Sequence, residues 1–193
     1  MNTLTAAFPI EKTKKSRIAE VDFKNLEFGK HVADHMVIAE YVDGQWQTPR
    51  IVPYGDLKMS PSMLALHYGQ SIFEGMKAFR MKDGRVNIFR PLRHHARLQK
   101  SLDRMCMPPI PEDLFMQTLH SLIEIDSEWV PRGEGTSLYI RPLVYASEAR
   151  LGVKVADRYT YLVMTSPAGI YLNKPFKLKV EDKYVRTAEG GPG

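Results

Sequence analysis

Two pairs of apolar runs in the first half of the chain are each separated by an Asp-Gly turn. The turns are Asp43-Gly44 and Asp83-Gly84. Glycine adopts positive φ at no steric cost, so Asp-Gly between strand-like runs favours a tight reversal. The pattern therefore predicts two β-hairpins, formed by residues 36–42 with 45–46 and by residues 76–80 with 86–89.

Two helical patterns follow the second hairpin. Pro91 suits the first position of a helix, and apolar residues recur after it at mostly helical spacing until Pro108-Pro109. Pro111 opens a second helix with an apolar stripe at i, i+4, i+7 and i+8. The apolar positions are Leu92, Ala96, Leu98, Leu102, Met105 and Cys106 in the first helix, and Phe115, Leu119, Leu122 and Ile123 in the second.

Residues 137–146 and 159–166 are rich in Tyr, Ile, Leu and Val, which favours strands. Strands, two helices and strands therefore follow one another along the chain. This order predicts an α+β fold, a small, mainly antiparallel sheet domain with helices to one side.

The polar and glycine-rich segments predict the domain organisation. Residues 1–20 are polar and lysine-rich and are expected to form a flexible arm, followed by the α+β domain over residues 21–166. Residues 167–175 have the Pro and Gly content of an interdomain linker. A strand is expected to begin at Phe176, so that residues 176–193 would start a second, larger domain that is truncated here.

Composition narrows the class of protein. Hydrophobic residues make up 44% and charged residues 25%, as in soluble globular proteins, and no apolar run approaches the roughly 18 residues of a membrane span. No apolar run follows the lysines of the first 20 residues, which argues against a secretory signal. The single cysteine, Cys106, excludes an internal disulfide and fits a reducing cytoplasm.

The net charge of +5 is spread along the chain. The densest basic group lacks interleaved aromatic residues, so we expect a solvated helix face or a small phosphate site and no nucleic-acid partner. The histidine spacing gives no metal motif, and no metal is expected. The basic group is Arg90, Arg93, His94, His95, Arg97 and Lys100.

Several aromatic and arginine residues stand in strand-like context, and taken singly each fits a core or surface position. The segments around them resemble, in order and spacing, the branched-chain aminotransferases of pyridoxal-phosphate fold type IV. The resemblance runs from Phe28 to Gly193 and covers the first half of a family member. The segments are 28–29 (FG), 34–36 (DHM), 66–69 (LHYG), 73–79 (FEGMKAF), 89–91 (FRP), 136–142 (TSLYIRP), 151–153 (LGV) and 184–186 (YVR).

The resemblance implies a cofactor, pyridoxal 5′-phosphate, whose phosphate would be bound by Arg97. A guanidinium group suits this role because it offers a planar set of donors and stays charged. The implied reaction exchanges amino groups between leucine, isoleucine or valine and 2-oxoglutarate, giving branched 2-oxo acids and glutamate.

The resemblance also implies a substrate pocket and a homodimer. Phe28, Phe73 and Tyr139 match apolar walls of the pocket, and Arg141 matches an arginine that helps to accept the second carboxylate of glutamate. Residues that match those reaching the site of a neighbouring subunit are Tyr68, Leu151 and Val153.

The Schiff-base lysine of the family would lie beyond Gly193, so no catalytic residue is expected in this chain, and the chain alone is expected to be inactive. We favour a piece of a working aminotransferase. The alternatives are a non-catalytic dimerisation or binding module, or another fold type IV enzyme such as a D-amino-acid aminotransferase or an aminodeoxychorismate lyase. The region of Phe28 and residues 76–79 argue against another enzyme.

Overall fold

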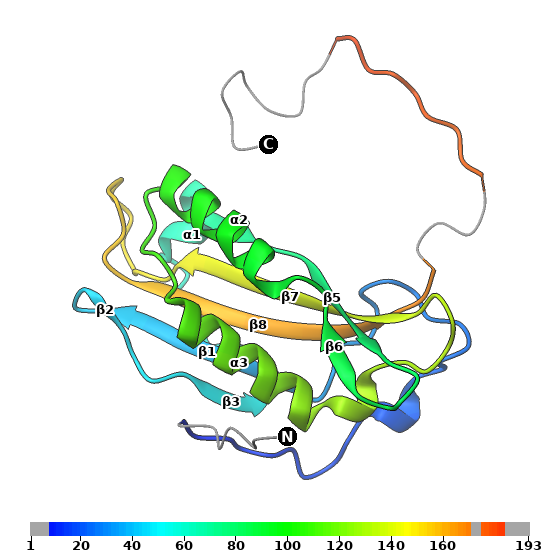
Figure 1. Ribbon diagram of the computed structural model, residues 1–193. Helices are drawn as coiled ribbons and strands as arrows, with labels where there is room; N and C mark the ends of the chain where they lie inside the picture. The colour runs from blue at the N-terminus through cyan, green and yellow to red at the C-terminus, as the bar shows by residue number, and fades with distance from the viewer. Residues whose placement is uncertain (1–7, 171–174, 184–193) are drawn as a thin grey trace.

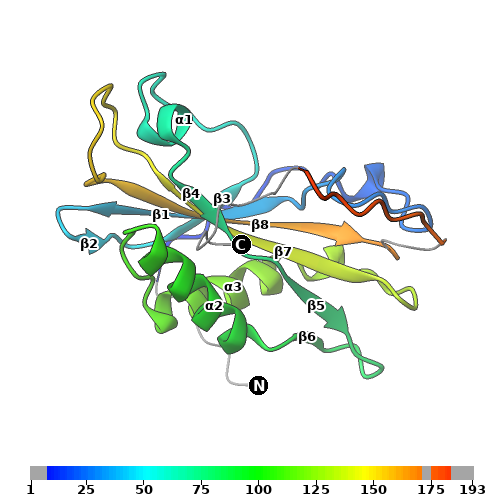
Figure 2. The same ribbon diagram turned by 90° about the horizontal axis from the view of Figure 1, so that it is seen from above.

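The computed structural model describes residues 8–170 and 175–183 and shows a curved sheet with two long helices on one face (Figures 1 and 2). The helices are α1 (Leu64–Tyr68), α2 (Pro91–Arg104) and α3 (Glu112–Ile125), with 3-10 turns at Ile18–Glu20 and Ser127–Trp129. The strands are β1 (His35–Val42), β2 (Gln45–Trp46), β3 (Arg50–Pro53), β4 (Ser71–Phe73), β5 (Met76–Arg80), β6 (Val86–Ile88), β7 (Ser137–Ala146) and β8 (Tyr159–Ala168).

The sheet is antiparallel at every strand pair of the described residues. Its order is β2-β1-β8-β7-β5-β6, with β3 paired to β1 and β4 paired to β7. The centre is the long β7–β8 ladder, which runs from Ser137 opposite Ala168 to Ala146 opposite Tyr159. Both strands are buried along most of their length, as their β-branched and aromatic residues favour. The predicted α+β class is confirmed.

Both predicted hairpins are formed. Asp43 and Gly44 have φ values of 53° and 79°, the left-handed conformation that a two-residue turn between twisted strands requires. The first hairpin is closed by an edge-on contact between Tyr41 and Trp46, whose ring centroids are 5.3 Å apart. The second hairpin connects β5 to β6 through a turn in which the Gly84 N–H donates to the Met81 carbonyl at 2.9 Å. Local turn chemistry is therefore sufficient to place these strands.

Helices α2 and α3 cover one face of the sheet, and their apolar stripes form the main core with it (Figure 2). Phe115, Leu119 and Leu122 of α3 have no exposed surface. Helix α2 ends at Arg104, earlier than the apolar pattern predicted, because Cys106 has φ of 53° and cannot continue a right-handed helix. The short helix α1, which the sequence pattern did not predict, lies on the opposite side of the sheet (Figure 2).

The N-terminal segment packs against the sheet, which differs from the expected flexible arm. Phe8 is buried, and the N–H of Thr13 donates to His35 Nε2 at 2.9 Å. The carboxylate of Asp34 accepts hydrogen bonds from the Ser16 hydroxyl at 2.5 Å and from the Arg17 N–H at 2.9 Å. Side-chain acceptors on the β1 side therefore order residues 8–20, an effect that composition does not reveal. Residues 1–7 lie outside the described residues.

The end of the described chain also differs from the expectation. Pro167 and Ala168, expected in the linker, still pair with β7 and extend β8. Residues 175–183 form no strand, although one was expected from Phe176. Leu178 and Val180 are 82% and 86% exposed, because these described residues pair with no neighbouring strand. The rest of the linker at 171–174 and the predicted motif at 184–186 lie outside the described residues.

Candidate active site

An ion pair joins the β4–β5 connection to helix α2. Glu74 follows β4, and its N–H donates to the Pro142 carbonyl at 2.9 Å, which fixes the backbone against β7. Arg97 Nε donates to Glu74 Oε2 at 2.7 Å, and Arg97 Nη2 donates to Glu74 Oε1. The Glu74 side chain is 4% exposed, whereas that of Arg97 is 65% exposed. A buried carboxylate thus holds an arginine that faces solvent.

The surroundings of Glu74 favour its charged form. Burial alone would raise the pKa of Glu74, but hydrogen bonds from Arg97 and from the Gly75 N–H outweigh burial and lower the pKa below its ordinary value. The hydrogen bond to Glu74 raises the pKa of Arg97. His94 Nδ1 lies 3.4 Å from Glu74 Oε1 and adds a third polar neighbour. The Glu74–Arg97 pair is therefore ionised at neutral pH.

Phe28, Tyr139, Arg141 and Phe73 form a continuous chain of contacts. The rings of Phe28 and Tyr139 meet edge to face with centroids 4.9 Å apart. The Arg141 guanidinium lies 4.6 Å from the Phe73 ring centroid and 5.2 Å from that of Tyr139. Arg141 Nη2 also donates to the Tyr139 hydroxyl at 3.1 Å. The structure therefore brings together these residues, which come from distant parts of the sequence.

A cavity of about 360 Å³ lies beside this contact chain. Tyr139 and His94 line it, but Phe28, Phe73 and Arg141 do not. Arg97 lies next to the cavity, because its partner Glu74 precedes Gly75 in the chain and contacts His94. Both Gly75 and His94 line the cavity. The lining consists of Gly75, Met76, Lys77, Phe79, Phe89, His94 and Tyr139.

Gly75 allows Tyr139 to occupy its place. A Cβ atom at Gly75 would lie 2.6 Å from the Tyr139 hydroxyl oxygen and 3.0 Å from Cε2 of the ring. Such distances are shorter than van der Waals contact, so any side chain at this position would push the Tyr139 ring away. The present position of the Tyr139 ring therefore depends on a glycine here.

Tyr68 and Leu151 are joined apart from this contact chain, and Val153 lies two residues after Leu151. The Tyr68 hydroxyl donates to the Leu151 carbonyl, and Leu151 and Val153 are 68% and 80% exposed. The loop after β7 is attached near α1 by a hydrogen bond of 2.9 Å from the Leu64 N–H to the Glu148 carbonyl. In Figure 2 this loop and α1 lie side by side, across the sheet from α2.

Sequence reasoning did not single out Glu74 or predict its contacts with Arg97 and His94. Glu74 stands within the FEGMKAF segment at 73–79, yet nothing in that segment shows that its carboxylate is buried or that it pairs with Arg97. The basic group on α2 was expected to share a solvated face or a phosphate site. Instead, His94 turns towards Glu74, and His95 is buried with Nε2 2.8 Å from the Ile110 carbonyl oxygen.

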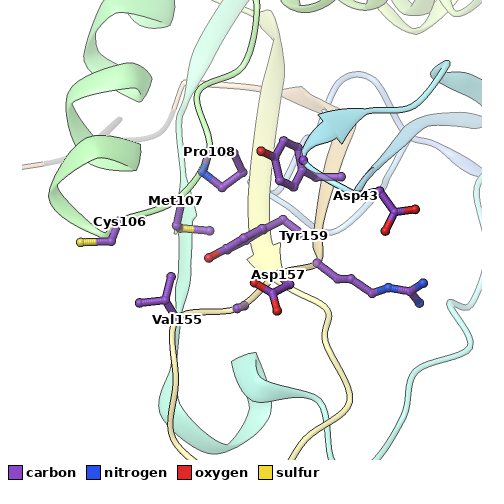
Figure 3. A pocket seen from close by; sticks show the side chains of 11 residues that line it. Asp43, Cys106, Met107, Pro108, Val155, Asp157 and Tyr159 are labelled. Atoms are coloured by element: carbon purple, nitrogen blue, oxygen red, sulfur yellow. The ribbon is translucent and has the colours of Figure 1, made fainter.

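Two of the larger cavities in the described part of the chain are lined by none of the predicted site residues. One of about 630 Å³, shown in Figure 3, is lined by residues that include Asp43, Cys106 and Tyr159. It adjoins the C-terminal end of α2, whereas the smaller cavity adjoins the N-terminal end. Another, of about 710 Å³, lies between the N-terminal segment and α3. Volume alone therefore does not identify the site. The cavity of about 360 Å³ is the candidate because Tyr139 lines it and the Glu74–Arg97 pair lies beside it.

The site lies within a segment that matches a known protein family. The pattern described as "Amino-transferase class IV" matches residues 71–187, which include Glu74, Arg97 and Tyr139. The chain belongs to the class IV aminotransferases. Among its relatives is Branched-chain-amino-acid transaminase 1 of Bacillus subtilis strain 168, which is 46% identical over 177 residues. That match covers 89% of this chain and 50% of the relative, so the chain spans about half the length of the curated relatives.

Solved aminotransferases share the fold. A branched-chain aminotransferase from Thermoproteus uzoniensis, crystallised with norvaline, superposes with a TM-score of 0.57 at 22% identity, covering 72% of this chain and 43% of the other. A second solved branched-chain aminotransferase, with pyridoxamine 5′-phosphate, superposes with a TM-score of 0.50 at 26% identity, covering 70% and 41% respectively. In the part of this chain that the structure describes, no helix is long and apolar enough to cross a membrane.

Proposed function

We propose that the protein carrying this chain transfers amino groups between branched-chain amino acids and 2-oxoglutarate with pyridoxal 5′-phosphate. The products would be the branched 2-oxo acid and glutamate. The observation that carries the proposal is the solvent-facing Arg97, held by buried Glu74 beside an aromatic cavity. The names of the relatives, branched-chain-amino-acid transaminase or aminotransferase, support this substrate class.

The residues present fit the phosphate of the cofactor. A guanidinium group has five N–H donors, and Glu74 uses the one on Nε and one on Nη2 of Arg97. The remaining edge can donate to phosphate oxygens, as arginine does in bidentate contacts. Arg97 would hold the phosphate. When bound, pyridoxal phosphate supplies an electron sink that makes the α-proton of an amino acid acidic.

The aromatic contact chain would bind the substrate side chain. Phe28 and Tyr139 present apolar ring surface, and removing a branched aliphatic chain from water favours binding by about 0.8 kcal/mol per CH₂. Arg141 would pair with the second carboxylate of glutamate, since its guanidinium is stacked on Phe73 and oriented by Tyr139. The same group of residues would thus contact an apolar and an acidic partner in turn.

The group of Tyr68, Leu151 and Val153 supports a homodimer. These apolar side chains are 48%, 68% and 80% exposed, and burial against a second copy would remove them from water. By resemblance to the family, they would then reach the site of the neighbouring subunit. We keep the cytoplasm as the proposed location, because a lone cysteine suits a reducing compartment.

A substrate comparison tests the proposed function. The purified protein that carries this sequence is incubated with pyridoxal phosphate, 2-oxoglutarate and either L-leucine or D-alanine, and glutamate formation is measured. We expect glutamate from L-leucine, and a loss of that rate when Phe28 is replaced by alanine. Glutamate from D-alanine alone would favour the D-amino-acid enzyme, and no glutamate from either donor would refute amino transfer.

A further inference from the structure

We propose that Glu74 is a positioning residue that orients the Arg97 guanidinium towards an incoming phosphate before the phosphate binds. The inference rests on the proposed function, since it takes Arg97 as the phosphate anchor. It assigns a role to a carboxylate that itself would not touch the anion.

The backbone around Glu74 makes this carboxylate a fixed reference point. Glu74 lies between β4 and β5, and its N–H is bonded to the Pro142 carbonyl of β7 at 2.9 Å. Its Oε1 accepts from the Gly75 N–H at 2.8 Å and lies 3.4 Å from His94 Nδ1. A side chain that is 4% exposed and bonded in this way has little freedom to change rotamer.

Without Glu74, the Arg97 side chain would be mobile. Its side chain is 65% exposed on the surface of α2, and a solvated arginine samples many rotamers. Two contacts to one carboxylate, from Nε and from Nη2, fix both the position and the plane of the guanidinium group. They occupy one edge of the group and leave the Nη1 and Nη2 edge for a second anion. Because the arginine is ordered in advance, phosphate binding does not carry the entropy cost of ordering it.

The charge of Glu74 acts in the opposite direction. A carboxylate next to the anchor repels an anion, and this repulsion is weakened by solvent at an exposed site and by the positive charge between them. If Glu74 mainly orients Arg97, removing the Glu74 charge should weaken phosphate binding; if it mainly repels the anion, removing the charge should strengthen binding. The direction of the change in affinity therefore tests the inference.

Binding measurements on four proteins separate these effects. We would measure the dissociation constant of pyridoxal 5′-phosphate by calorimetry for the wild type, Glu74→Gln, Arg97→Ala and the double variant. Glu74→Gln keeps the shape but loses one acceptor oxygen, and we expect roughly three- to tenfold weaker binding. The double variant should bind like Arg97→Ala alone, because Glu74 acts through Arg97. Unchanged or tighter binding by Glu74→Gln would overturn the inference.

The same set of proteins distinguishes the inference from the proposed function. If Arg97→Ala binds pyridoxal phosphate as well as the wild type, the anchor is misassigned, and both proposals lose their basis. If Arg97→Ala binds weakly while Glu74→Gln does not, only the positioning role fails.

A measurement on the wild type avoids dependence on how a variant folds. In ligand-free protein labelled with ¹⁵N, the Nε–H of Arg97 should be rigid, with an order parameter above about 0.8, whereas that of exposed Arg93 on the same helix should lie below about 0.6. Equal mobility of the two arginines would show that Arg97 is not ordered in advance and would refute the inference.

Discussion

Replacing Gly75 with alanine should displace Tyr139 and disconnect the aromatic contact chain. The new Cβ would lie 2.6 Å from the Tyr139 hydroxyl, so the ring must move. Movement breaks the edge contact with Phe28, worth about 0.5–1.5 kcal/mol, and the hydrogen bond from Arg141, worth about 0.5–1.5 kcal/mol. We therefore expect the free energy of unfolding to fall by about 1–3 kcal/mol.

The assay is urea unfolding of the purified chain, with near-ultraviolet circular dichroism to follow the tyrosine environment. Gly55→Ala is the matched control, because among the described residues no atom beyond its chain neighbours lies within 4 Å of its added Cβ, and its φ is not left-handed. The control should be neutral or slightly stabilising. In a Tyr139→Phe background, Gly75→Ala should cost less, since the closest contact is gone. Equal stability of the Gly75 and Gly55 variants, with unchanged tyrosine dichroism, would refute the steric argument.

Three further predictions concern the core and the buried polar network. Leu119→Ala should lower the free energy of unfolding, measured in urea, by about 2–5 kcal/mol. The control Leu92→Ala, at an exposed position, should change it by less than about 0.5 kcal/mol. Similar changes in the two variants would contradict the assigned core. Asp126→Ala should cost about 1–3 kcal/mol in the same assay, because it leaves the buried His35 ring and backbone N–H without their acceptor. A cost below about 0.5 kcal/mol would contradict that role. Burial raises the pKa of Asp34, but the hydrogen bonds to its carboxylate outweigh burial and lower the pKa below the ordinary value of 3.8. The contribution of Asp34 to stability is therefore present above pH 3.8 and is lost as the pH falls through the lowered pKa. The free energy of unfolding of Asp34→Asn should therefore fall less than that of the wild type as the pH is lowered. An equal dependence of the two proteins on pH would contradict this role of Asp34.

The hairpins and the two long helices could be predicted because their signals are local. Positive φ at Gly44 and the stripe of Phe115 and Leu119 depend on neighbours a few residues away. Short elements such as α1 and β4 were missed, since a few residues carry too little periodicity. The strand expected at Phe176 shows the reverse error, because an alternating pattern forms a strand only where a partner strand is in reach.

The resemblance could propose a set of site residues, but it could not predict their geometry. The resemblance pointed to Arg97 and Tyr139, yet it could not show that Glu74 is buried or that it binds Arg97 from 23 positions away. Likewise, the polar composition of the N-terminal segment predicted an arm, and only the fold reveals that Asp34 holds it. Buried polar partners are determined by tertiary contacts, which leave no periodic trace in a sequence.

The affinity for pyridoxal 5′-phosphate of the Arg97→Ala protein tests the central claim most directly. Losing charge-assisted hydrogen bonds to a phosphate should raise the dissociation constant about 10- to 100-fold. The control Arg93→Ala removes an exposed arginine from the same helix and should bind like the wild type. Equal dissociation constants for the wild type and the Arg97→Ala protein would contradict the phosphate site at this position.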